Sequence, residues 1–146
     1  MTGMRPEAIE GRRASTGSAP TGSSRRPLVG PLMAAVGAIH VAITPVVYGP
    51  SVRSVVDGGV VATIDAEPAL AEQRGVGFWY ATAGLAMIAY GIAIAERERQ
   101  DAPLPVSLPV SMAAIGTWGV VLMPKSPFWV FGPLAALAAV RRRARR

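Results

Sequence analysis

His40 is the residue of this sequence best suited to chemistry, because it is the only histidine and it lies in a long run without charge. No Asp, Glu, Lys or Arg occurs within residues 27–49. An ionisable side chain in such a run is a candidate for ligand binding or proton transfer, because polar groups are costly inside a membrane. A neutral histidine that forms a hydrogen bond across a helix interface would explain the same pattern. The sequence leaves both interpretations open.

Thr44 joins His40 in a candidate intramembrane polar site. Gly37, His40 and Thr44 are separated by three and four residues, so they share one face of a helix. That face carries small and weakly polar side chains, which favour contact with another helix in a membrane. We therefore expect His40 to point into a helix bundle rather than at lipid.

No catalytic or metal-binding motif is recognisable in the rest of the sequence. Cysteine is absent, and one histidine cannot supply both axial ligands of a haem. No carboxylate occurs in the apolar runs to complete a metal site. The charged run from Glu96 to Arg99 is interpreted as a solvated helix end. We predict no catalytic residue, no metal, no cofactor and no enzymatic activity, and the sequence identifies no cofactor-binding residue.

The distribution of charge predicts the elements that would position these residues. Hydrophobic residues make up 51% of the chain and charged residues 16%, against roughly 25% charged in an average soluble domain. The charges gather between four apolar runs, which we predict to be membrane-spanning helices. These runs are residues 27–49, 76–95, 103–123 and 127–140.

The predicted fold class is therefore all-α, with a four-transmembrane-helix bundle over residues 27–146. Residues 1–26 are rich in Gly, Ser, Thr, Pro and Arg, which predicts a disordered basic tail on the cytoplasmic side. The fourth run, residues 127–140, covers only about 21 Å, less than the roughly 30 Å of a hydrocarbon core. A re-entrant hairpin formed with the third run is the alternative.

Local signals divide the chain further. Pro45 and Gly49 are expected to bend and then end the first helix. In the first outer loop, residues 50–75, Asp65 and Pro68 predict a short surface helix that reaches about residue 74. Regular helix in the third run is expected from about residue 106, after closely spaced prolines. Ser126 is suited to the N-cap of the fourth helix, and the proline after it to the first helical position.

Glycines recur at spacings that bring helices together. Gly77, Gly84 and Gly91 lie seven residues apart in the second run, and Gly116 and Gly119 lie together in the third. Such stripes allow helix backbones to approach closely. We interpret these residues, with Gly37, as helix-packing positions. A homodimer face would give the same pattern.

Aromatic and basic residues mark the predicted membrane interfaces. Phe78 and Trp79 open the second run, and Phe128 and Trp129 open the fourth, as in an aromatic belt. Lys125, in the turn before the fourth run, is interpreted as a headgroup contact. The alternative is a cation at the outer mouth of a cavity in the bundle.

The basic residues predict the orientation. With both termini in the cytoplasm, twelve of the fifteen Lys and Arg residues lie inside and three outside. Cytoplasmic loops are enriched in Lys and Arg, so we predict a multi-pass protein of the cell membrane with both termini cytoplasmic. The net charge of +6 and the pI of about 11.0 then indicate an anionic bilayer surface as partner, and no nucleic acid.

Several of these motifs resemble a family of small bacterial four-helix integral membrane proteins that is catalogued only as a domain of unknown function. The motifs are Gly37-x-x-His40, Phe78-Trp79 and Met123-Pro124-x-Ser126-x-Phe128-Trp129. The resemblance covers about residues 28–140. It implies a four-helix bundle in the bacterial inner membrane with His40 facing inward, and it implies no activity.

The leading functional hypothesis is a non-enzymatic accessory or structural protein that acts through helix–helix contacts, as a homo-oligomer or with a second membrane protein. The glycine stripes and the lack of buried charge favour it. The alternative is a small-molecule binding or transport protein with an intramembrane pocket near His40. A quinone-linked redox component is a third hypothesis, which rests on His40 and two tryptophans, Trp79 and Trp118.

Overall fold

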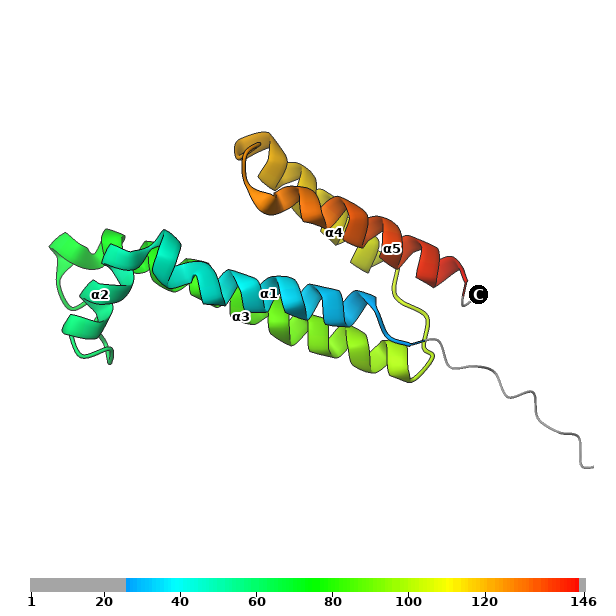
Figure 1. Cartoon of the computed structure of the whole chain (residues 1–146), viewed down its shortest axis with the longest axis horizontal. Helices are drawn as coiled ribbons and strands as arrows, with labels where there is room; N and C mark the ends of the chain where they lie inside the picture. Colours follow the sequence, from blue (N-terminus) through cyan, green and yellow to red (C-terminus); the bar gives the residue numbers. More distant parts are fainter. Residues whose placement is uncertain (1–25, 145–146) are drawn as a thin grey trace, which may run out of the picture.

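The protein is all-helical over residues 26–144, which the computed structural model describes (Figure 1). Those residues form five α-helices and one short 3-10 helix, and no strand occurs among them. The predicted tail, residues 1–26, lies outside the described residues except for its last residue. The elements in chain order are α1 (Val29–Val47), α2 (Gly49–Asp57), α3 (Pro68–Arg99), α4 (Ser107–Leu122), η1 (Pro127–Val130) and α5 (Phe131–Arg143).

The helices are arranged as two hairpins. Helix α1 packs along α3, and α4 packs on η1 and α5 (Figure 1). Among the described helices, only α1 and α5 bring Cα atoms of the two hairpins within 8 Å of each other. Figure 1 shows the start of α1 and the ends of α3 and α5 at one end of the molecule, which we call the terminal end, and α2 at the opposite end.

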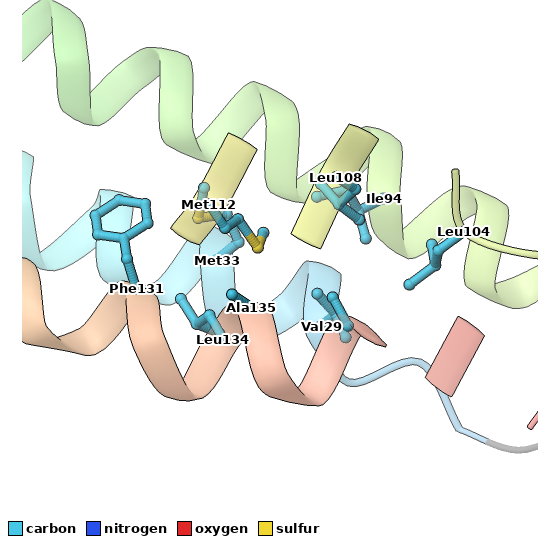
Figure 2. Close-up of a cluster of buried hydrophobic side chains, with 10 residues drawn as sticks. Val29, Met33, Ile94, Leu104, Leu108, Met112, Phe131, Leu134 and Ala135 are labelled. Carbon is cyan, nitrogen blue, oxygen red and sulfur yellow. The ribbon is translucent and has the colours of Figure 1, made fainter. Parts of the chain in front are cut away.

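A buried apolar cluster joins the two hairpins (Figure 2). It draws side chains from α1, α3, α4, α5 and the segment before α4. Leu104, Leu108 and Met112 are each at most 2% exposed. Burial of such side chains contributes roughly 1.5–3 kcal/mol each relative to exposure in water. The members are Val29, Met33, Ile94, Leu104, Leu108, Met112, Phe131, Leu134, Ala135 and Ala138.

Two helices are long and apolar enough to cross a membrane, judged by length and composition. They are α1, with 19 residues, and α3, with 32 residues and a length of about 48 Å. Helix α4 is apolar but has 16 residues, and α5 has 13. The all-α class is confirmed for the described residues, whereas only two of the four predicted spans meet the length and composition of a membrane span, so the four-span bundle stays a prediction.

The prediction of a short surface helix near residues 65–74 is wrong. Pro68 occupies the first turn of α3, which runs without a break through Gly75 and the predicted second span. Proline suits a first helical turn, and a single glycine costs a helix only about 1 kcal/mol, so nothing in this stretch ends the helix. The short helix of this region is α2, which begins at Gly49 with proline in its first turn.

The ends of α1 and α5 also differ from expectation. Helix α1 ends at Val47, and the Tyr48 N–H donates to the Thr44 carbonyl at 2.8 Å. Helix α5 begins only at Phe131, because η1 forms the first turn after Ser126. The Ser126 hydroxyl donates to the Met123 carbonyl at 2.7 Å and therefore does not cap a helix. The start of α4 at residue 107 agrees with the prediction.

Candidate functional site

Glycines form the contact between α1 and α3. A Cβ atom built on Gly37 would lie 2.6 Å from the Gly84 carbonyl oxygen and 2.8 Å from the Ile88 nitrogen. A Cβ atom on Gly91 would lie 2.5 Å from the Ala34 nitrogen and 2.7 Å from the Gly30 carbonyl oxygen. All four opposing atoms belong to backbone, which cannot rotate away. The two helices are therefore antiparallel and in direct backbone contact, which only glycine permits at these positions.

The other glycines named from the sequence face different partners. A Cβ on Gly77 would meet the Ser51 side chain of α2. A Cβ on Gly116 would lie 2.9 Å from the Phe131 Cβ, and one on Gly119 would enter the Phe128 ring. Gly77 thus lies against α2 at the end of the α1–α3 contact, and the glycines of α4 receive aromatic side chains from η1 and α5.

His40 lies against an aromatic side chain of α3. Its ring stacks on Tyr80 with centroids 3.8 Å apart and planes at 17°, and Tyr48 approaches Tyr80 at 4.8 Å. The Thr44 hydroxyl donates to the His40 carbonyl oxygen at 3.0 Å. The Thr44 hydroxyl therefore contacts the backbone of His40 and not its imidazole. The imidazole is half-buried and takes part in the contact between α1 and α3.

Arg74 connects several segments at the end of the molecule where α2 lies. Its side chain is only 4% exposed. Its guanidinium donates to the Ser54 hydroxyl at 2.9 Å, to the Thr63 carbonyl at 2.8 Å and to the Glu67 carboxylate at 2.9 Å. A buried guanidinium needs such partners, because an unpaired buried charge is strongly destabilising. This residue holds α2 and the following loop against α3. The sequence alone predicts only that Arg74 lies in the first outer loop, residues 50–75.

Ser51 completes this end. Its hydroxyl donates to the Arg74 carbonyl at 3.1 Å and accepts from the Gly77 N–H at 3.2 Å. Beside it lies an open cavity of about 570 Å³, which Arg53, Asp57, Glu67 and Arg74 help to line. Two positive and two negative side chains face this cavity, so it favours neither an anion nor a cation.

Glu98 connects three helices at the terminal end. Its carboxylate is 1% exposed and accepts the backbone N–H groups of Leu28, Val29 and Gly30 at 3.0, 3.2 and 2.9 Å. These are donors of the first turn of α1, whose cap residue forms no side-chain cap. A carboxylate at this position also complements the positive end of the helix dipole.

Arg141 of α5 joins this site. Its guanidinium lies 3.4 Å from the Glu98 carboxylate and donates to the Arg26 carbonyl at 2.7 Å. The interpretation of the Glu96–Arg99 run as a solvated helix end is therefore wrong for Glu98, since this side chain points into the molecule. One sequence signal was available. The start of α1 has no Ser, Thr, Asp or Asn to accept from its first N–H groups, so these groups need another acceptor, either water or a side chain from elsewhere in the chain.

The predicted interfacial residues occupy two different environments. Trp79 and Trp129 are 68% and 63% exposed, and Lys125 is exposed as well. The Phe78 ring contacts the Trp79 ring edge-on at 5.1 Å. Phe128 differs, because it is half-buried and stacks near Phe131 at 6.1 Å in the contact between α4 and α5. The Trp129 indole N–H donates to the Pro124 carbonyl at 2.9 Å, which holds the turn.

A second cavity of about 350 Å³ lies along α4, η1 and α5, where Thr117, Trp129 and Gly132 help to line it. Neither of the two cavities includes His40. Within residues 26–144, no group of three His, Asp or Glu side chains is placed to hold a metal ion. The described side chains therefore converge at the glycine contact, at Arg74 and at Glu98, and these three sites all join helices.

The comparison with known proteins gives one match. The family described as "Family of unknown function (DUF6463)" matches residues 24–145. The match agrees with the resemblance to a domain of unknown function, and it says nothing of source or membrane. No curated protein and no solved structure matches the chain.

Proposed function

Because the chain belongs to DUF6463, a family of unknown function, we propose its role from its own residues: a multi-pass protein of the bacterial inner membrane that acts through helix–helix contacts and not as an enzyme. Four helical segments would span the bilayer, with both termini in the cytoplasm. The observation that carries the proposal is the large apolar surface that the two hairpins leave uncovered.

That surface distinguishes the long helices from the core helices of a water-soluble protein. In the most apolar stretch of 18 residues, only 28% of α1 and 22% of α3 are buried. A soluble core helix of this hydropathy would be mostly buried, because exposed apolar patches of this size are rare in soluble monomers. Ile39, Leu85 and Trp118 are all exposed, on three different helices. Lipid or another helix is needed to cover them.

The lengths of the second hairpin are compatible with two further spans. Helix α4 extends about 24 Å, and η1 with residues 131–140 of α5 extends about 23 Å. These values approach the roughly 30 Å of a hydrocarbon core, and modest mismatch is accommodated at small cost. Arg141, Arg142 and Arg143 follow the last apolar turn of α5, where their long side chains can reach a headgroup region.

We expect single-cysteine labelling to give the four-span topology. The natural chain has no cysteine, so each introduced thiol is the only target. In intact cells, a membrane-impermeant maleimide should label Asp57→Cys and Lys125→Cys. Asp101→Cys and Arg143→Cys should react only after permeabilisation. These four positions lie outside the helices or at a helix end.

The Lys125→Cys variant distinguishes a second hairpin that crosses the bilayer from one that does not. If α4 and α5 formed a hairpin that does not cross the bilayer, Lys125 would lie on the same side as Asp101, and both thiols would need permeabilisation. That result would contradict the four-span topology but would leave α1 and α3 as spans. Release of the protein by alkaline carbonate would contradict membrane insertion itself.

The accessory role is supported by the positions of the polar and small residues, which mostly form contacts within the chain. Gly37, Arg74 and Glu98 all serve contacts between elements of the chain itself, which leaves the outer apolar faces as the surfaces available to partners. The small-molecule alternative at His40 has less support, because the ring is stacked on Tyr80 and neither of the two cavities reaches it.

Photo-crosslinking in native membranes tests this role. We expect a photoreactive residue at exposed Trp118, Leu85 or Ile39 to give a discrete protein adduct, either a second copy or another membrane protein. A control at Met112, which is 1% exposed, should crosslink only within the chain. Adducts with lipid alone at every exposed position would contradict the accessory role.

A further inference from the structure

We infer that the arginines gathered at the terminal end form a docking surface for the phosphodiester headgroups of anionic phospholipids. We call this surface the arginine rim. It consists of Arg26 before α1, Arg97 and Arg99 at the end of α3, and Arg141, Arg142 and Arg143 at the end of α5. The inference rests on the proposed function, because it requires this end of the molecule to lie at a bilayer surface.

The fold brings these arginines together from distant parts of the sequence. The Arg141 guanidinium donates to the Arg26 carbonyl at 2.7 Å, which ties the end of α5 to the segment before α1. The Glu98 carboxylate is bound to the first turn of α1 and fixes the end of α3 beside them. Figure 1 shows the three chain segments meeting at the terminal end. The rim is therefore held in place by the contacts of the buried Glu98 carboxylate and by the exposed hydrogen bond between Arg141 and Arg26.

The charges of the rim suit an anionic partner. The segments that form the rim contain six arginines and three carboxylates, those of Glu96, Glu98 and Asp101. The Glu98 carboxylate points inward and is 1% exposed, so the outer surface keeps an excess of positive charge. The guanidiniums of Arg26, Arg97, Arg99 and Arg143 are exposed. A guanidinium can bind two phosphate oxygens at once, which a point charge cannot do.

Neighbouring side chains favour a lipid over a free phosphate ion. Two exposed apolar residues lie close to rim arginines in the sequence. Leu28 lies two positions after Arg26 at 39% exposure, and Val140 directly precedes Arg141 at 63%. A phospholipid would place its phosphate on the rim and its acyl chains along these residues. A free phosphate ion would contact only the arginines and would leave these apolar residues uncovered.

The test is native mass spectrometry of the full chain released from detergent micelles that contain phosphatidylglycerol and phosphatidylcholine. We expect preferential retention of phosphatidylglycerol. In the Arg142→Gln/Arg143→Gln variant, apparent affinity for phosphatidylglycerol should fall roughly thirtyfold, since each of the two basic residues near an anionic surface contributes about 1 kcal/mol. The Arg53→Gln/Lys125→Gln variant has the same net charge and removes exposed cations outside the arginine rim. Because Lys125 is itself interpreted as a headgroup contact, the affinity of this variant should fall by no more than about fivefold, clearly less than that of the rim variant.

Two results would overturn the inference. One is equal retention of phosphatidylglycerol by the two variants. The other is displacement of the bound lipid by excess inorganic phosphate, which would identify a free anion as the ligand. A protein that resists carbonate extraction but shows no lipid preference would refute only the arginine rim. A protein that carbonate releases would refute the proposed function, and this inference would fall with it.

Discussion

Replacement of Glu98 by glutamine is expected to lower the free energy of unfolding by about 3 kcal/mol, the cost of breaking a buried ionic contact on one side. The natural carboxylate accepts the N–H groups of Leu28, Val29 and Gly30 and faces Arg141. A glutamine would keep one acceptor oxygen and turn an NH₂ group toward donors. The first turn of α1 and the Arg141 guanidinium would then lose their shared partner.

Glu96→Gln is the matched control. Glu96 lies two residues earlier on α3, carries the same charge and is exposed, so its replacement should change stability by no more than about 0.5 kcal/mol. Both variants can be compared by thermal unfolding in the same detergent micelle. Equal melting temperatures for the two variants would show that Glu98 does not hold the helix ends together.

Sequence reasoning missed Glu98 for a physical reason. In the run from Glu96 to Arg99, each charge has an opposite neighbour nearby in the chain, which is typical of a solvated helix end. The partner that buries Glu98 lies about seventy positions away, at the start of α1. Local pattern cannot identify such a pairing. The absence of a capping residue before α1 only indicated that some acceptor was needed.

Arg74 was missed for a related reason. An arginine in a loop between apolar runs was counted as a charge that sets topology, and its burial depends on Ser54, Thr63 and Glu67 meeting around it. The same folding explains the misplaced surface helix. Residues 68–74 lie outside the predicted second span, but they belong to α3, and α2 packs against this helix. The end of an apolar run therefore predicts the end of a span and not the end of a helix.

Patterns of small and apolar residues gave better predictions. The all-α class and the start of α4 near residue 106 follow from long apolar runs and from the positions of proline, and both agree with the structure. Four spans and cytoplasmic termini remain predictions. His40 stayed ambiguous because its neighbour Tyr80 lies on another helix, and helix pairing could not be read from one sequence.

At the glycine contact between α1 and α3, the addition of one methyl group by a glycine-to-alanine substitution should have a large effect on stability. Gly37 and Gly84 face each other, and so do Gly30 and Gly91, which lie seven residues earlier on α1 and seven residues later on α3. In a membrane, helices gain no hydrophobic stabilisation from packing on each other, so close van der Waals contact and shape decide their association. Within the proposed membrane span, the backbone-to-backbone approach at these glycines is therefore expected to contribute strongly to the association of α1 and α3.

We expect Gly37→Ala to lower the free energy of unfolding by about 2–3 kcal/mol, the upper range for overpacking of a close contact. The new Cβ would lie 2.6 Å from the Gly84 carbonyl oxygen, so the helices must separate. Gly75→Ala, on α3 with no atom within 4 Å of its added Cβ, should instead stabilise by about 0.5–1 kcal/mol through helix propensity. Unfolding of both variants in one detergent gives the comparison. Opposite signs would support the contact, whereas stabilisation by Gly37→Ala would show that α1 and α3 are not packed this closely.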